Sequence, residues 1–104
     1  ENVDPVNEAD SPYNYAADQD VQYVFEETGV NVTIENFNSG DQLELPDLDN
    51  AMVTNTSFND GEVDVEWHDA GKDIIATLGV DTAVDGNLNS ISAFNAEFGA
   101  GTVV

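Results

Sequence analysis

The chain has 104 residues, of which 40% are hydrophobic, and it carries 22 acidic residues against a single basic one, for a formal net charge of -21. This size and apolar content predict one globular domain with a modest core. The charge excludes nucleic-acid binding, because phosphate contacts require Lys and Arg. No apolar run reaches the length of a membrane-spanning helix, so we expect no membrane insertion.

The N-terminal part shows a change of character near residue 12. Residues 1–12 are acidic, contain Pro5 and Pro12, and show no periodicity, which predicts a flexible acidic linker followed by a single β domain over 13–104. Tyr13 and Tyr15 flank Asn14 in a short alternating piece that predicts an edge strand. Apolar and polar residues then alternate over 21–26, which predicts a second strand.

The strongest local pattern covers residues 30–46. Val30, Val32 and Ile34 alternate with polar residues, as in a half-buried strand. Residues 38–41 read Asn-Ser-Gly-Asp, which is turn chemistry. Alternation resumes after this turn and ends at Pro46, which has no N–H to donate to a ladder. The pattern predicts a β-hairpin that supplies about half of the core.

The remaining chain predicts three strands, a short helix and a terminal strand. Alternation predicts strands over 51–56, 62–68 and 73–80, joined by turns at 59–61 and 69–72. Ser90 is a suitable cap for a helix in which Ile91, Phe94 and Phe98 recur at helical spacing before Gly99. Residues 102–104 are β-prone and could pair at a sheet edge. The fold expected is all-β, an antiparallel β-sandwich or roll of about seven strands with a short C-terminal helix.

Calcium is the ligand that the charge suggests first, since Ca²⁺ binds carboxylate, amide and carbonyl oxygens in loops. Residues 47–50 begin like an EF-hand, but Met52 stands where such a loop needs Gly, and the glycine-rich calcium nonapeptide is missing. The alternative is that these side chains are solvated turn residues of a salt-adapted surface. The candidate ligands are Asp18, Asp20, Asp41, Asp47, Asp49, Asn50, Asp60, Asp81 and Asp85.

Catalysis is not expected. His68 is the single histidine, on the outward face of its strand beside Glu66 and Asp69, and no nucleophile motif accompanies it. The aromatic side chains offer a platform for sugar rings instead. Trp67 and Tyr23 are in phase with apolar neighbours and are expected in the core, which leaves Tyr13 and Tyr15 as the freer pair.

Three stretches carry a family resemblance. They are V-T-I-E-N-F-N-S-G-D-Q-L-E-L-P, S-F-N-D-G-E-V-D-V-E-W and F-N-A-E-F-G-A-G-T-V-V. Residues 13–104 thereby resemble the C-terminal region of bacterial type I-secreted, RTX-like, calcium-associated surface or extracellular proteins. The resemblance implies an extracellular or cell-surface location and a non-catalytic terminal module that serves export and extracellular folding.

The function expected is therefore a calcium- or salt-stabilised, non-catalytic module of a secreted or cell-surface protein, with divalent cations as partners. One alternative is a carbohydrate-binding or adhesive module of a marine or halophilic surface protein, with glycans or other surface proteins as partners. A second is a structural, self-associating domain of a surface layer.

Overall fold

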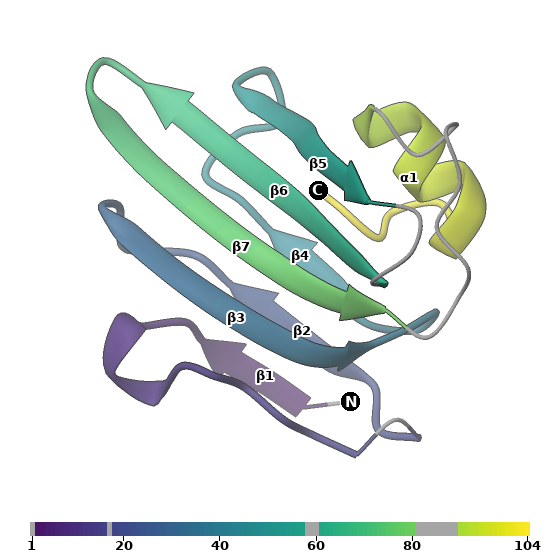
Figure 1. The fold of residues 1–104 in the computed structure, drawn as a ribbon. Coiled ribbons are helices and arrows are strands. Elements are labelled where there is room, and N and C mark those ends of the chain that lie inside the picture. Colours follow the sequence, from purple (N-terminus) through teal and green to yellow (C-terminus); the bar gives the residue numbers. More distant parts are fainter. Residues whose placement is uncertain (1, 17, 58–60, 81–89) are drawn as a thin grey trace.

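The computed structural model describes residues 2–16, 18–57, 61–80 and 90–104. These residues form two sheets and one short α-helix (Figure 1). Sheet A has the order β1-β2-β4, and sheet B has the order β3-β7-β6-β5. The elements are β1 (Asn2–Pro5), the 3-10 helix η1 (Glu8–Asp10), β2 (Val21–Val24), β3 (Val30–Phe37), β4 (Gln42–Glu44), β5 (Ala51–Ser57), β6 (Glu62–Asp69), β7 (Lys72–Val80) and α1 (Ile91–Phe98).

Sheet A is entirely parallel, which corrects the prediction of an antiparallel fold. β2 pairs in parallel with both β1 and β4. The C-terminal residues extend this sheet beyond β4, because Leu43 donates to the Thr102 carbonyl at 2.7 Å and Val104 donates to the Leu43 carbonyl at 2.9 Å. The bridge between Leu43 and Val103 is also parallel. The predicted pairing of residues 102–104 at a sheet edge is confirmed.

Sheet B is mixed. β6 pairs antiparallel with β5 and with β7, so the hairpins expected from the alternating strands are present. The tight turn between β6 and β7 has positive φ at Ala70 (52°) and Gly71 (84°), which is the backbone of a type I′ turn. β3 lies at the opposite edge and pairs with β7 in parallel.

The predicted hairpin over 30–46 is wrong, although both of its strands form. β3 lies in sheet B and β4 lies in sheet A. The backbone of Asn36 has a positive φ of 59°, and the pairing register of β3 shifts between Ile34 and Phe37. This irregularity turns the Phe37 side chain inward, fully buried, and the turn that follows carries the chain across the core instead of back along β3.

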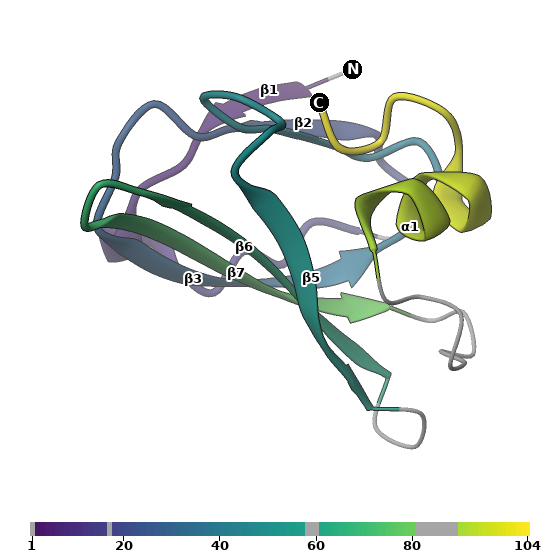
Figure 2. The ribbon, with the colours of Figure 1, turned by 90° about the horizontal axis from the view of Figure 1, so that it is seen from above.

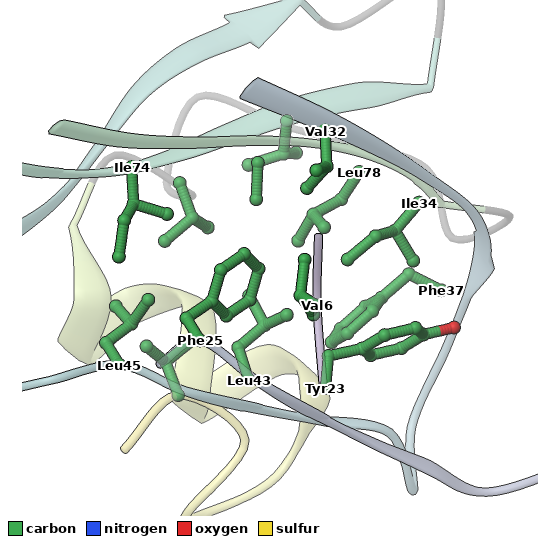
Figure 3. Packing of buried hydrophobic residues seen from close by; sticks show 14 of the residues in the cluster. Val6, Tyr23, Phe25, Val32, Ile34, Phe37, Leu43, Leu45, Ile74 and Leu78 are labelled. Carbon is green, nitrogen blue, oxygen red and sulfur yellow. The ribbon is translucent and has the colours of Figure 1, made fainter. Parts of the chain in front are cut away.

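The two sheets lie one above the other in Figure 2, and a single cluster of buried side chains fills the space between them (Figure 3). Tyr23, Phe25 and Leu43 enter it from sheet A, and Ile34 and Leu78 enter from sheet B. The alternating strands thus bury one face each, as their period of two requires. Trp67 and Tyr23 are 3% and 1% exposed, so their predicted place in the core is confirmed.

The first twelve residues belong to the packed domain, in contrast to the linker expected from their composition. Asn2–Pro5 form β1, and Val6 is 3% exposed and donates to the Val24 carbonyl at 2.8 Å. No periodicity indicated β1, because the strand has four residues and its valine, Val3, is 62% exposed.

The predicted C-terminal helix is confirmed. The Ser90 hydroxyl accepts from the N–H of Ala93 at 3.0 Å, and Gly99 ends the helix with a φ of 126°. Phe94 and Phe98 are buried, with ring centroids 4.6 Å apart. The helix thereby covers one end of the core.

Candidate functional site

Asp41 is buried, with 4% of its surface exposed. Its Oδ1 accepts from the N–H of Val21 at 3.0 Å, and its Oδ2 accepts from the N–H of Asn38 at 3.1 Å. Burial raises the pKa of the Asp41 carboxyl above its usual range, and the nearby charge of Asp20 also raises it, while the two backbone donors oppose the shift. Both oxygens of Asp41 therefore accept hydrogen bonds from the backbone. We call this arrangement, which fixes the turn between β3 and β4, the turn lock.

Asp18 and Asp20 are exposed in the segment that precedes β2. Of the two, Asp20 is the one placed next to Asp41. Its carboxylate lies so close to Gly40 that a Cβ at that position would come within 2.4 Å of Asp20 Oδ1. Two carboxylates, Asp20 and Asp41, thus meet around the turn between β3 and β4.

The loop before β5 contains the next candidates. Asp47 Oδ1 accepts from the main-chain N–H of Asn50 at 3.1 Å and from its side-chain amide at 2.9 Å. Asp49 is exposed. Because the oxygens of Asp47 accept from N–H donors of Asn50, three residues on, this loop closes on itself.

Calcium binding stays a prediction. Asp60, Asp81 and Asp85 lie outside the described residues. Within the described residues, no group of three His, Asp or Glu side chains converges so that it could hold a metal ion. Four of the six described candidates form pairs, Asp20 with Asp41 and Asp47 with Asn50, and calcium requires about six oxygens.

His68 lies on the outer face of sheet B between two carboxylates. Its Nδ1 is 2.7 Å from Asp73 Oδ1, and its Nε2 is 2.7 Å from Glu66 Oε1. The hydroxyl of Thr54 donates to the other oxygen of Glu66 at 2.5 Å. Hydrogen bonds to Asp73 and then to Glu66 raise the pKa of His68, and bonds from Thr54 and His68 lower the pKa of Glu66.

This cluster has a definite chemical consequence. Carboxylates accept hydrogen bonds, so an imidazole that bonds one on each side carries hydrogen on both nitrogens. The two carboxylates therefore stabilise the protonated form of His68, in which both ring nitrogens donate. The cluster ties β5, β6 and β7 together on their solvent face.

Of the two tyrosines near the N-terminus, Tyr13 lies in the core and Tyr15 lies partly at the surface. Tyr13 was expected to be free, but it is 5% exposed, and its hydroxyl bonds both the N–H and the carbonyl of Asn7. Tyr15 is half-buried, and its hydroxyl donates to Asp4 Oδ2 at 2.5 Å. The two rings contact Tyr23 edge-on, at centroid distances of 5.8 and 6.3 Å.

A cavity of about 290 Å³ lies beside these rings. Carboxylates of Asp4 and Asp10 and the amide of Asn14 line it together with Pro12 and the two tyrosines. An aromatic face next to hydrogen-bonding groups is the arrangement that favours small polar ligands.

The chain matches no protein-family model, no curated protein and no solved structure. Within the described residues, no helix has the length and apolar character needed to cross a membrane.

Two residues, one in the His68 cluster and one beside Tyr15, were not predicted from the sequence. Asp73, five positions after His68, is brought beside it by the β6–β7 pairing of His68 with Asp73, and that proximity follows from the hairpin register. Asp4 reaches Tyr15 because β1 is part of sheet A. No local pattern indicated β1, so no signal in the sequence pointed to Asp4.

Proposed function

We propose that this domain is a non-catalytic β module of a secreted or cell-surface bacterial protein, and that dissolved cations, calcium or sodium, stabilise it. The observation that carries the proposal is the lack of internal counter-charge: 22 acidic residues face a single lysine. Two ion pairs between described side chains both use His68. The negative charge must therefore be balanced from the solution.

The dimensions of the domain make this balance important for stability. The principal extents are 31 × 27 × 23 Å. The Debye length is about 30 Å at 0.01 M salt and about 3 Å at 1 M salt. In dilute salt every carboxylate thus repels every other one across the whole domain, and in concentrated salt the repulsion is confined to close neighbours.

The architecture supports the same proposal. Two sheets that face each other across one core are the plan of a β-sandwich, a common form for extracellular modules. The stretches 32–46, 57–67 and 94–104 resemble the C-terminal region of type I-secreted proteins. Under this proposal the module serves export and folds outside the cell, where calcium is abundant.

The test is thermal unfolding of the domain in sodium chloride, in calcium chloride at matched ionic strength, and in EDTA. We expect Tm to rise with ionic strength in both salts. A further rise in calcium, beyond that in matched sodium, would assign a specific calcium site. A Tm that does not change between dilute and concentrated salt would contradict the proposal, because charge repulsion would then be without effect on folding.

A carbohydrate-binding module is the second candidate, and the cavity beside Tyr15 is the observation that favours it. Its ring is partly exposed, and Asp4, Asp10 and Asn14 offer hydrogen-bonding groups around it. Retention on insoluble polysaccharides would support it if Tyr15→Ala abolished retention and Val3→Ala, at an exposed position outside the cavity lining, did not. Absence of retention on every glycan tested would remove it.

A further inference from the structure

The two edges of sheet A are both protected against pairing with another strand. One edge is β1, which has four residues and ends in Pro5, and short strands with proline are poor templates for pairing. At the other edge, the Asn95 side chain accepts from the Val103 N–H at 2.8 Å and donates to the Val103 carbonyl at 3.2 Å. The groups that an added strand would use at this edge are already bonded.

The β3 edge of sheet B is protected in a similar way. Glu8 Oε2 accepts from the N–H of Asn31 at 2.8 Å, and the Ser11 hydroxyl accepts from the N–H of Thr33 at 2.9 Å. The main chain of Tyr13 then donates to the Thr33 carbonyl at 2.8 Å. Side chains and main chain of the N-terminal segment thus cover this edge.

Among the described residues, no strand covers the β5 edge. β5 is seven residues long and contains no proline, and the described residues place a strand on its β6 side alone. The Asn50 carbonyl accepts from the His68 N–H, and bonded and non-bonded pairs alternate along an antiparallel ladder. The main chain of Val53, opposite Val65, therefore turns its N–H and carbonyl away from β6.

β5 and α1 lie side by side (Figure 2), and an apolar groove lies between them along this edge. Its volume is about 480 Å³, and Ala51, Val53 and Ile91 are among the residues that line it. Leu48 and Met52 also line it, and each is 44% exposed. An open strand edge beside an apolar groove is the arrangement by which proteins bind extended peptides, with main-chain pairing for affinity and side-chain pockets for selectivity.

The negative charge of the domain favours a basic segment at this groove. Asp49, which is exposed, lines the groove, while Glu66 on the outer face is already bonded to Thr54 and His68. A second copy of the domain would bring its own net charge of -21 to the contact. A segment with Lys or Arg meets attraction instead, and electrostatic complementarity of this kind favours encounter and orientation.

We propose that the β5 edge and its groove bind an extended segment of another protein in which apolar residues alternate with Lys or Arg. The segment pairs with β5 through its main chain. Its apolar side chains enter the groove towards Val53 and Ile91, and its basic side chains lie on the face of Thr54 and Glu66. This binding surface does not depend on whether calcium stabilises the domain.

The experiment uses the 104-residue chain and a blocked peptide of about eight residues that alternates Lys and Val. Binding is followed by amide chemical-shift changes in NMR spectra at physiological ionic strength. We expect saturable shifts at the β5 amides, and much weaker binding of a peptide that alternates Lys and Ser, since it has the same charge and no apolar side chains. Equal binding of the two peptides would overturn the proposal, because charge alone would then explain it.

Matched charge variants locate the site. Met52→Lys and Leu48→Lys change exposed positions, so both should fold, and each should raise the Kd of the Lys-Val peptide about tenfold. Val3→Lys makes the same charge change at a position 62% exposed on β1 and should leave the Kd within about twofold. An equal effect of Val3→Lys, absence of binding, or a concentration-dependent dimer that Met52→Lys dissociates would each overturn the proposal, the last by assigning the edge to a second copy.

Discussion

The carboxylate of Asp41 accepts a hydrogen bond of 3.0 Å from the backbone N–H of Val21, across 20 positions of sequence. The same carboxylate accepts from Asn38 within its own turn. The buried side chain of Asp41 therefore joins the turn between β3 and β4 to the first residue of β2.

Replacement of Asp41 by Ala should lower the free energy of unfolding by about 3 kcal/mol, because two buried N–H groups lose a charged acceptor. Asp41→Asn should cost less, since it keeps one acceptor oxygen. Urea unfolding in high salt measures both. Asp18→Ala is the control at an exposed position and should stay within about 0.5 kcal/mol of the parent; an equally small effect of Asp41→Ala would mean that the turn lock does not contribute to stability.

Stability should depend on pH through His68. Its pKa is raised above the ordinary 6.5 by Asp73 and Glu66, so its contribution is fully present below pH 6.5 and is lost as pH rises through the raised value. The difference in Tm between the parent and His68→Gln should therefore be largest near pH 6 and shrink in alkaline buffer. Ala96→Gln, exposed on α1, should give a difference that does not vary with pH, and the same constancy for His68→Gln would rule out the cluster as a titrating element.

The helix cap gives a third prediction. Ser90→Ala removes the hydroxyl that accepts from the N–H of Ala93, and we expect a loss of about 1 kcal/mol in unfolding free energy. Ser92 is exposed inside the same helix. Ser92→Ala should be neutral or slightly stabilising, because Ala has the higher helix propensity. If the two substitutions had the same effect in urea unfolding, Ser90 would not act as a cap.

Asn95 gives a fourth prediction, because it fixes the C-terminal segment through both main-chain groups of Val103. Asn95→Ala should cost about 1–2 kcal/mol and should speed hydrogen exchange at Leu43 and Val104, whose amides bond across this junction. Asn95→Asp keeps the acceptor for the Val103 N–H and should have the smaller effect. Unchanged exchange at Leu43 in Asn95→Ala would show that the segment is held without Asn95.

The sequence pattern identified the inward face of most strands, and the structure explains why it could not identify their neighbours. Val63, Val65 and Trp67 alternate because one face of β6 is buried. That alternation is the same whether a strand pairs in a hairpin, as β6 does with β7, or crosses to the other sheet, as the chain does between β3 and β4. Period and turn residues fix which face is buried, and long-range packing fixes the partner.

The same limit applies to the candidate site, where local patterns indicated single residues and the tertiary fold decided their partners. The turn chemistry around Gly40 left open whether Asp41 closes a turn or binds a metal, and its bond to Val21 depends on the tertiary fold. His68 was expected on the outer face beside Glu66, and the bond to Asp73 was added by the register of β6 and β7. Nothing in the sequence indicated that the Asn95 side chain bonds the main chain of Val103, since an Asn on a helix is compatible with many surroundings.

The parallel arrangement of sheet A has a consequence for the order of synthesis. Its first strand, Asn2–Pro5, leaves the ribosome about a hundred residues before residues 102–104, which extend the sheet beyond β4. The strand pairings of sheet A join residues that lie far apart in the chain, and such pairings form slowly because a large loop must close first. Within these 104 residues, sheet A can therefore be completed only after residues 102–104 have been made.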